Sequence, residues 1–128
     1  MVKVHKAVEG KLRQTVVVRG HQWSADVEPA LGGDDAGPDP HELLDAALGA
    51  CTALTVTMVA RRKQMPLDDV IVQVRREEAD GVCRLFRQVE LVGTLDAAQR
   101  QYLLGIANKC PVHKTLMGRF EIDTSLAP

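Results

Sequence analysis

Residues 39–63 hold a long apolar segment with its own start and stop signals, and this segment constrains the fold more than any other part of the sequence. Asp39 is suited to cap a helix, Pro40 to occupy its first position, and Glu42 to complete a capping box. The basic run at residues 61–63 complements the negative end of a helix dipole. We therefore predict one helix between these signals.

Apolar side chains cover almost every face of this predicted helix. They are Leu43, Leu44, Ala46, Ala47, Leu48, Ala50, Leu54, Val56, Met58 and Val59. A helix that is apolar all round must be surrounded by other material. Its nearly uncharged part, residues 46–60, is shorter than the roughly 20 residues that a bilayer requires, so we predict a buried core helix and no membrane contact. A chain of 128 residues has little material to wrap it, so we expect a second copy to cover part of it, in a homodimer.

The segments before the helix favour strands and then a loop. Residues 2–27 carry β-branched runs separated by Gly10 and Gly20, which predicts three short antiparallel strands. Residues 28–40 concentrate glycine, proline and aspartate, and no pattern there would sustain a helix or a strand ladder. We expect an ordered loop or a flap.

The segments after the helix favour a hairpin and a second helix. Residues 70–75 and 85–92 show the mixed and alternating patterns of two strands, with a turn at residues 79–81. Residues 94–96 offer caps for a helix that continues to about Lys109.

The last part of the chain completes an α+β order of elements. We predict a short helical turn after Pro111 and a final strand near residues 119–124. Strands, helix, strands and helix in this order indicate an α+β fold with antiparallel sheets around a long buried central helix. We find no internal repeat and no linker, so residues 1–128 are expected to form a single domain.

Charge and cysteine usage narrow the class of protein. The formal net charge is -1, so no positive field is present to hold nucleic acid or an anionic membrane. The first residues show no apolar stretch of signal-peptide length, which favours a cytoplasmic location. In a reducing compartment, cysteines are more often catalytic, metal-binding or packed in the core than joined in structural disulfides. The three thiols are therefore the residues to weigh.

Each cysteine has a plain structural interpretation beside a functional one. Cys51 lies in the apolar helix among small neighbours, and a packed core cysteine would look the same. Cys110 precedes Pro111, so its thiol would lie at the start of a helical turn beside Lys109, where a lowered pKa is expected. The same residues could be only a stop signal for the preceding helix. Cys83 has no special neighbours in the sequence and is expected to be structural or partly exposed.

Metal and hydrolase sites are less well supported. Cys51, Cys110 and His113 could contribute to a zinc site, but the second close-spaced ligand pair that such sites use is absent. We therefore predict neither a metal nor a cofactor. Cys110, His113 and Glu42 could form a hydrolase triad, but no signature of such a nucleophile is present.

Two separated segments, residues 32–52 and residues 109–116, each contain a cysteine, and together they resemble the OsmC/Ohr family of osmotically inducible and organic hydroperoxide resistance proteins. Residues 32–52 read GGDDAGPDPHELLDAALGACT, which is similar to the family's first cysteine motif. Residues 109–116 read KCPVHKTL, which is similar to its second cysteine motif. The order of strands and helices also resembles the family pattern along essentially the whole chain.

This resemblance implies an OsmC-like fold, an intertwined homodimer with active sites near the subunit interface, and a thiol-dependent peroxidase that serves in oxidative stress defence. It implies that Cys51 attacks the peroxide and that Cys110 closes a disulfide, which a dithiol such as dihydrolipoamide or another thiol then reduces. A thiolate that attacks a peroxide becomes a sulfenic acid, which condenses with a neighbouring thiol, so this chemistry needs no cofactor. The apolar surroundings of Cys51 would favour organic hydroperoxides over hydrogen peroxide.

The groups that would activate Cys51 depart from the better-known members of this family. Those members use an arginine from the N-terminal region and a glutamate one residue earlier than Glu42, where this sequence has His41. We take Glu42 and Arg19 as the candidate orienting and activating residues. Two alternatives stay open: a non-catalytic member that binds an apolar ligand, and a redox-regulated structural dimer.

Overall fold

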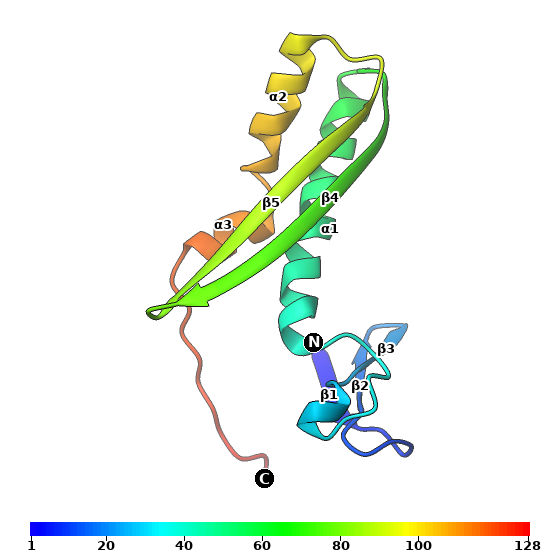
Figure 1. Cartoon of the computed structure of the whole chain (residues 1–128), viewed down its shortest axis with the longest axis vertical. Coiled ribbons are helices and arrows are strands. Elements are labelled where there is room, and N and C mark those ends of the chain that lie inside the picture. The colour runs from blue at the N-terminus through cyan, green and yellow to red at the C-terminus, as the bar shows by residue number, and fades with distance from the viewer. The chain divides into compact units, whose positions relative to one another are not determined.

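The computed structural model describes all residues, 1–128, and the chain divides into two compact units, Met1–Ala46 and Ala47–Pro128 (Figure 1). Both β-sheets are antiparallel, and three α-helices accompany them, which confirms the predicted α+β fold class. Helix α1 (Pro40–Arg62) begins in the first unit and continues into the second. The assignment of the whole chain to a single domain stays a prediction.

The first unit contains the three predicted strands. They are β1 (Val2–Lys6), β2 (Gln14–Val18) and β3 (His21–Ala25), hydrogen-bonded in the order β1-β2-β3. Val16 lies in the central strand opposite Val4 and Trp23, and its side chain is buried. The two-residue turn between β2 and β3 agrees with the tight turn predicted at Gly20, whereas a longer loop, residues 7–13, connects β1 to β2.

The carboxylate of Asp26 organises the glycine- and proline-rich loop that follows. It accepts hydrogen bonds from the backbone N–H groups of Val27, Asp34 and Ala36 at 2.8, 3.2 and 3.0 Å. Aspartate commonly fixes loops in this way by accepting from nearby backbone donors. The loop also contains one 3₁₀ turn, η1 (Pro29–Leu31), which the sequence analysis did not expect. Pro29 favours this turn because its fixed φ suits a first helical position.

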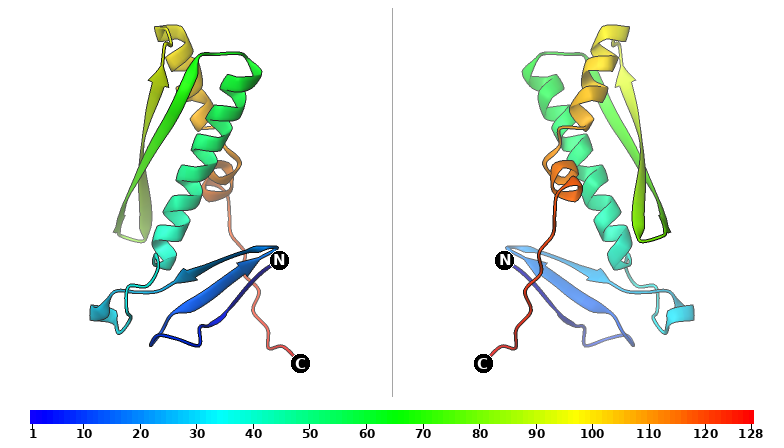
Figure 2. Two further views of the ribbon diagram at one scale, coloured as in Figure 1. Left: turned by 90° about the vertical axis from the view of Figure 1, so that its right-hand side faces the viewer. Right: turned by 90° about the vertical axis from the view of Figure 1, so that its left-hand side faces the viewer.

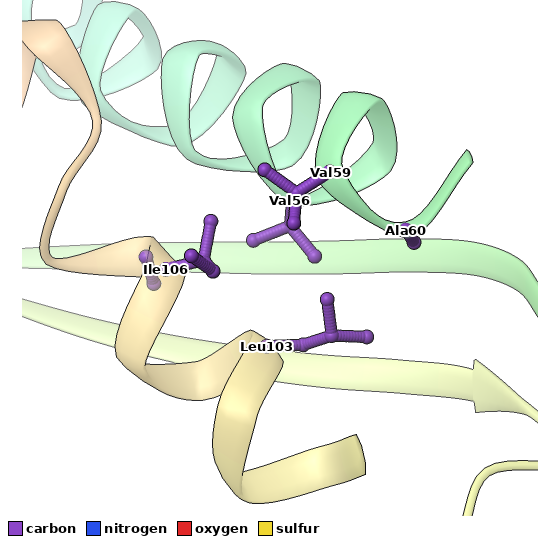
Figure 3. Close-up of a cluster of buried hydrophobic side chains, with 6 residues drawn as sticks. Val56, Val59, Ala60, Leu103 and Ile106 are labelled. Atoms are coloured by element: carbon purple, nitrogen blue, oxygen red, sulfur yellow. The ribbon is translucent and has the colours of Figure 1, made fainter. Parts of the chain in front are cut away.

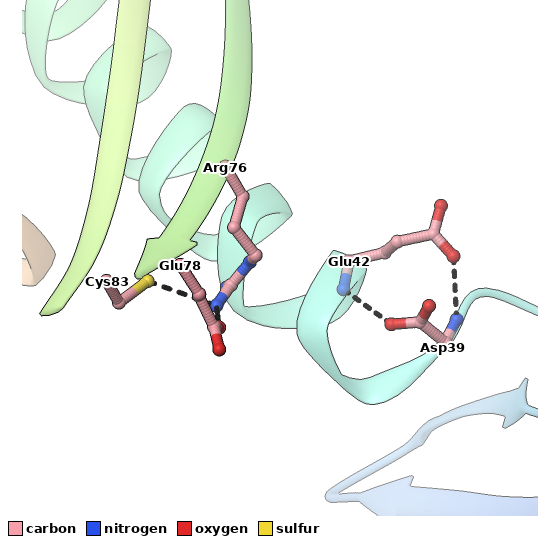
Figure 4. A network of polar contacts seen from close by, with 5 residues as sticks. All are labelled: Asp39, Glu42, Arg76, Glu78 and Cys83. Carbon is pink, nitrogen blue, oxygen red and sulfur yellow. Dashed lines mark hydrogen bonds and ion pairs between the residues drawn. The ribbon is translucent and has the colours of Figure 1, made fainter. Parts of the chain in front are cut away.

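Helix α1 begins at the predicted capping box, which Figure 4 shows in close-up. The backbone N–H of Glu42 donates to the Asp39 side chain at 2.9 Å, and the Asp39 N–H donates to the Glu42 carboxylate at 3.0 Å. The hydrogen bond from Glu42 is the main reason that the pKa of Asp39 is lowered. These two contacts confirm the predicted start of the helix.

The second unit is built on a long hairpin of β4 (Leu67–Ala79) and β5 (Val82–Gly93). Asp80 and Gly81 form the two-residue turn with φ angles of 54° and 74°. Such a turn needs positive φ at both positions, which aspartate and glycine tolerate. The hairpin and its turn confirm the prediction, although the strands extend beyond the predicted residues.

Two further helices follow the hairpin, α2 (Ala97–Ala107) and α3 (Pro111–Met117). Asp96 caps α2 and forms a capping box with Gln99. Within this unit, α1 and α2 pack beside the hairpin (Figure 2), and their facing side chains form the core in Figure 3. The buried members of this core are Val56, Val59, Ala60, Leu103, Ile106 and Ala107.

Helix α1 buries only part of its apolar surface within one chain. Its buried residues are Leu48, Thr52, Val56, Val59 and Ala60, whereas Leu54 and Met58 are 63% and 65% exposed. By length and composition alone, α1 could also cross a membrane. The helix has 23 residues, whereas the sequence analysis considered only the nearly uncharged residues 46–60. A core helix of a soluble protein passes the same test. The second subunit that would cover the exposed side stays a prediction.

The predicted final strand near residues 119–124 is wrong. Residues 118–128 form no helix or strand, and Phe120 and Ile122 are exposed. The alternation of these side chains suits a strand, but a strand also needs a neighbour to accept and donate backbone hydrogen bonds. Neither sheet of this chain supplies that neighbour to the C-terminal segment.

Candidate functional site

Cys51 lies in the middle of α1, in the part that belongs to the second unit, and its side chain is half-buried. Its Sγ is 4.0 Å from the hydroxyl of Thr55, one turn further along the helix. Residues four positions apart share one face of a helix, which accounts for this contact. The thiol is therefore accessible in part, unlike a sealed core cysteine.

Cys110 lies at the N-terminus of α3 and is completely buried. Its Sγ accepts a hydrogen bond from the backbone N–H of His113 at 3.3 Å, and Pro111 occupies the first helical turn. The sulfur thus takes the role that serine or aspartate usually has as a helix cap. This geometry confirms the predicted placement of the thiol at a helix start.

The side chain of Thr52 forms the contact between α1 and Cys110. Its Oγ1 lies 3.8 Å from the Cys110 sulfur and 2.7 Å from the backbone oxygen of Leu48, to which it donates. The Cys51 side chain also helps to lower the pKa of Cys110, which indicates that the two residues lie near each other. The two cysteines of the predicted pair therefore converge in one place, although 58 residues lie between them in the sequence.

Arg87 of β5 contacts Thr52 and Cys110 from the hairpin, and the sequence analysis did not identify it. One terminal nitrogen of its guanidinium donates to Thr52 Oγ1 at 2.9 Å and lies 4.0 Å from the Cys110 sulfur. The other donates to the Asn108 side chain at 2.9 Å and to Nδ1 of His113 at 3.1 Å. Arg87 is therefore the cation beside Cys110, whereas the side chain of Lys109, to which the sequence analysis gave this role, is exposed.

A signal for Arg87 was present in the strand pattern. In β5 the less exposed positions alternate, and Arg87 shares that side with Leu85, Val89 and Leu91. Alternate residues of a strand point to the same face. An arginine on the apolar face of an amphipathic strand is an exception that calls for a partner, and this exception identifies Arg87.

The surroundings of Cys110 lower the pKa of its thiol. Burial acts in the opposite direction and raises the pKa, but hydrogen bonds from the His113 backbone, Thr52 and Cys51, together with the charge of Arg87, outweigh it. Hydrogen bonds and a positive charge favour the thiolate because both stabilise the negative sulfur.

An apolar pocket of about 170 Å³ lies next to this cluster within the second unit. Arg87 and His113 provide its polar wall, and the remaining lining residues are Leu48, Cys83, Leu85, Leu116 and Met117. A cavity of about 150 Å³ is known to accept a single benzene ring, so this pocket is large enough for a small aryl or alkyl group.

Cys83 is exposed near the end of the hairpin, as expected, but it does have a neighbour. Arg76 donates to its sulfur at 3.2 Å and to the Glu78 carboxylate at 2.6 Å (Figure 4). No residue next to Cys83 in the sequence indicates this contact, because it is the pairing of β4 with β5 that brings Arg76 and Glu78 to it.

The other two candidate residues belong to the first unit. Glu42 completes the capping box of α1, and Arg19 lies in the turn between β2 and β3 with a φ of 53°. Their roles toward the thiols stay predictions. The structure contains no group of three or more histidine, cysteine or acidic side chains that could hold a metal ion.

Comparisons with known proteins agree with the fold and motifs described above. The profile of the family described as "OsmC-like protein" matches residues 32–125. None of the curated proteins matches the sequence.

Solved structures share the fold at low sequence identity. An OsmC-like protein from Mycoplasma pneumoniae is 17% identical with a TM-score of 0.76, over 92% of this chain and 86% of that one. A putative osmotic stress induced and detoxification response protein from Psychrobacter arcticus is 20% identical, with a TM-score of 0.74 and coverages of 89% and 85%. The organic hydroperoxide resistance protein OhrB of Bacillus subtilis is 23% identical, with a TM-score of 0.61 and coverages of 92% and 91%. The profile match covers well over half of the chain, and the chain therefore belongs to the OsmC-like protein family.

Proposed function

We propose that this protein is a thiol-dependent peroxidase that reduces organic hydroperoxides, with Cys51 as the attacking thiol and Cys110 as the resolving thiol. The observation that carries this proposal is that Thr52, the residue directly after Cys51, lies 3.8 Å from the sulfur of Cys110, a thiol with a lowered pKa. Family membership supports it, as do structural neighbours described as organic hydroperoxide resistance proteins from Legionella pneumophila and Bacillus subtilis.

In the first step the Cys51 thiolate attacks the outer oxygen of the hydroperoxide. The O–O bond breaks, and the alkoxide that leaves takes up a proton and departs as an alcohol. The peroxide is reduced, and the sulfur of Cys51 is oxidised to a sulfenic acid. Cys51 suits this step because its side chain is only half-buried, whereas Cys110 is fully buried and therefore shielded from the peroxide.

In the second step the Cys110 thiolate attacks the sulfur of the sulfenic acid. An S–S bond forms, the S–O bond breaks, and the hydroxide that leaves takes up a proton to become water. A dithiol such as dihydrolipoamide, or another thiol, then reduces the disulfide by thiol exchange and restores both thiols. No metal or other cofactor enters these steps.

Glu42 and Arg19 are the groups assigned to orient and activate Cys51 in this proposal. Glu42→Gln is a suitable test because the amide oxygen can still accept from the Asp39 N–H while the charge is removed. The variant should retain its helix but oxidise Cys51 more slowly, and so should Arg19→Gln. Unchanged oxidation rates in both variants would remove these two residues from the mechanism.

The proposed assembly is a cytoplasmic homodimer. The exposed side of α1 supports it, because Leu54 and Met58 leave a large part of their surface uncovered in one chain. Apolar surface of this kind is stabilised when a partner removes it from water. Light scattering of the purified protein should give twice the mass of one chain, and a monomer at all concentrations would contradict the assignment.

A turnover assay tests the enzyme directly. With cumene hydroperoxide and dihydrolipoamide, the intact protein should consume peroxide over many cycles, and Cys51→Ser should abolish this activity. Cys83→Ser is the matched control and should remain active, because Cys83 has no part in either step.

The apolar pocket favours one alternative function, the binding of a small apolar ligand without catalysis. Absence of peroxide consumption by the intact, fully reduced protein would favour this alternative. A single conversion of dithiol to disulfide without further turnover would instead favour a redox-regulated structural dimer.

A further inference from the structure

From the contacts of its guanidinium we infer that Arg87 is a positioning residue that holds Cys110 as a thiolate in the reduced protein, aimed at Cys51. The inference concerns the second step of the proposed function and rests on it. In this role Arg87 acts through Cys110.

The side chain of Arg87 is fixed from three sides. Thr52 of α1 accepts from one terminal nitrogen, while Asn108 and His113, on either side of Cys110, accept from the other. A guanidinium is planar, so these three hydrogen bonds determine both its place and its orientation. The nitrogen bound to Thr52 is also the one that lies 4.0 Å from the Cys110 sulfur.

The charge of Arg87 has no carboxylate partner. All the groups that accept from it, the Thr52 hydroxyl, the Asn108 amide and the His113 ring, are neutral as acceptors. A partly buried cation is stabilised when a negative group lies beside it. Cys110 is the group in contact with Arg87 that gains a negative charge when it loses a proton.

The buried sulfur of Cys110 also requires an opposite charge beside it when it is ionised. Cys110 is completely buried, and a buried charge is unfavourable unless it is paired and hydrogen-bonded. The His113 N–H supplies a hydrogen bond, and Arg87 supplies the opposite charge. Thr52 contributes less directly, because its one hydroxyl proton already goes to the nearer backbone oxygen of Leu48.

An ionised Cys110 has a direct consequence for the reaction. The thiolate, and not the thiol, attacks the sulfur of the Cys51 sulfenic acid, so the rate of disulfide formation follows the ionised fraction of Cys110. Loss of Arg87 should therefore slow the second step more than it slows the oxidation of Cys51.

The ionisation of Cys110 can be measured without any peroxide. In a Cys51→Ser, Cys83→Ser background Cys110 is the remaining cysteine, and the ultraviolet absorbance of its thiolate gives the midpoint of its titration. Arg87→Gln should raise this midpoint by about one pH unit or more, since an opposite charge at this range shifts a pKa by about 1–3 units. Arg87→Lys should lie between the two, because it keeps the charge but not the planar fork.

Arg84→Gln is the matched control, because Arg84 lies on the same strand with an exposed side chain. It should leave the midpoint unchanged. Circular dichroism should show that each variant is folded. If Arg87→Gln does not fold, the titration midpoint of Arg87→Lys decides the test. A midpoint that is the same in Arg87→Gln, Arg87→Lys and the parent background would overturn the inference.

The second measurement follows the reaction itself. After one equivalent of cumene hydroperoxide, Arg87→Gln with all three cysteines present should accumulate a Cys51 sulfenic acid that dimedone traps, whereas the intact protein should form the disulfide at least tenfold faster. Equal rates of disulfide formation would overturn the inference. If Cys51 is not oxidised in either protein, the proposed function fails, and the titration of Cys110 still decides the role of Arg87.

Discussion

The Thr52 hydroxyl lies 3.8 Å from the Cys110 sulfur and accepts a hydrogen bond from Arg87 at 2.9 Å. Thr52 is fully buried and follows Cys51 directly in α1. One side chain therefore links the helix that carries Cys51, the hairpin that carries Arg87 and the N-terminus of α3, where Cys110 lies. Its loss should affect both stability and chemistry.

Thr52→Val tests this link with a side chain of nearly the same shape. The variant leaves an N–H of Arg87 without its acceptor in a partly buried place, so the free energy of unfolding should fall by about 1–3 kcal/mol. Urea denaturation measures this change. Thr57→Val is the control, because Thr57 lies on the exposed side of the same helix, and it should change the free energy by less than about 0.5 kcal/mol.

The lowered pKa of Cys110 predicts a pH dependence of stability. The ordinary pKa of the thiol is 9.0, and the folded protein has a lower value, so the folded state releases the proton first as the pH rises. Stability from this group is therefore fully present above pH 9.0 and is lost as the pH falls through the lowered value.

Denaturant unfolding of the reduced protein at several pH values between 7 and about 9 measures this effect. The intact protein should gain stability relative to Cys110→Ser as the pH rises through this range. A difference between the two proteins that does not change with pH would show that Cys110 titrates in the same way in the folded and unfolded states.

Gly37 should tolerate no side chain. A Cβ at this position would lie 2.3 Å from the backbone oxygen of Ser24, which belongs to β3 and cannot move without disturbing the sheet. Gly37→Ala should therefore lower the midpoint of thermal denaturation clearly. Gly20→Ala is the control, because a Cβ at Gly20 meets nothing within 4 Å, and it should leave the midpoint almost unchanged. Equal effects of the two variants would contradict the packing described for the loop.

Local signals predicted much of the fold. The capping box of Asp39 and Glu42, the turn at Asp80 and Gly81 and the cap at Cys110 were all predicted, because each depends on residues close together in the sequence. The two cysteine motifs also led to the correct family, which the profile match confirms.

Contacts between distant residues could not be predicted in the same way. The final strand near residues 119–124 was predicted from its alternation, but its formation depends on a partner strand that the sequence pattern does not reveal. The place of Arg87 on the less exposed side of β5 indicates that its charge needs a partner, but the sequence does not reveal that this partner lies at Thr52 and Cys110. The site therefore depends on contacts between residues that are far apart in the sequence, such as Arg87 with Thr52, and these contacts are visible only in the structure.

The most direct measurement is the disulfide pattern after one equivalent of cumene hydroperoxide. Mass spectrometry of the digested protein should find Cys51 joined to Cys110, with Cys83 left as a free thiol. We predict this pairing because Thr52, the residue directly after Cys51, lies 3.8 Å from the Cys110 sulfur, while Cys83 is exposed near the end of the hairpin. A dominant disulfide through Cys83, or full oxidation of the protein with Cys110 still reduced, would contradict it.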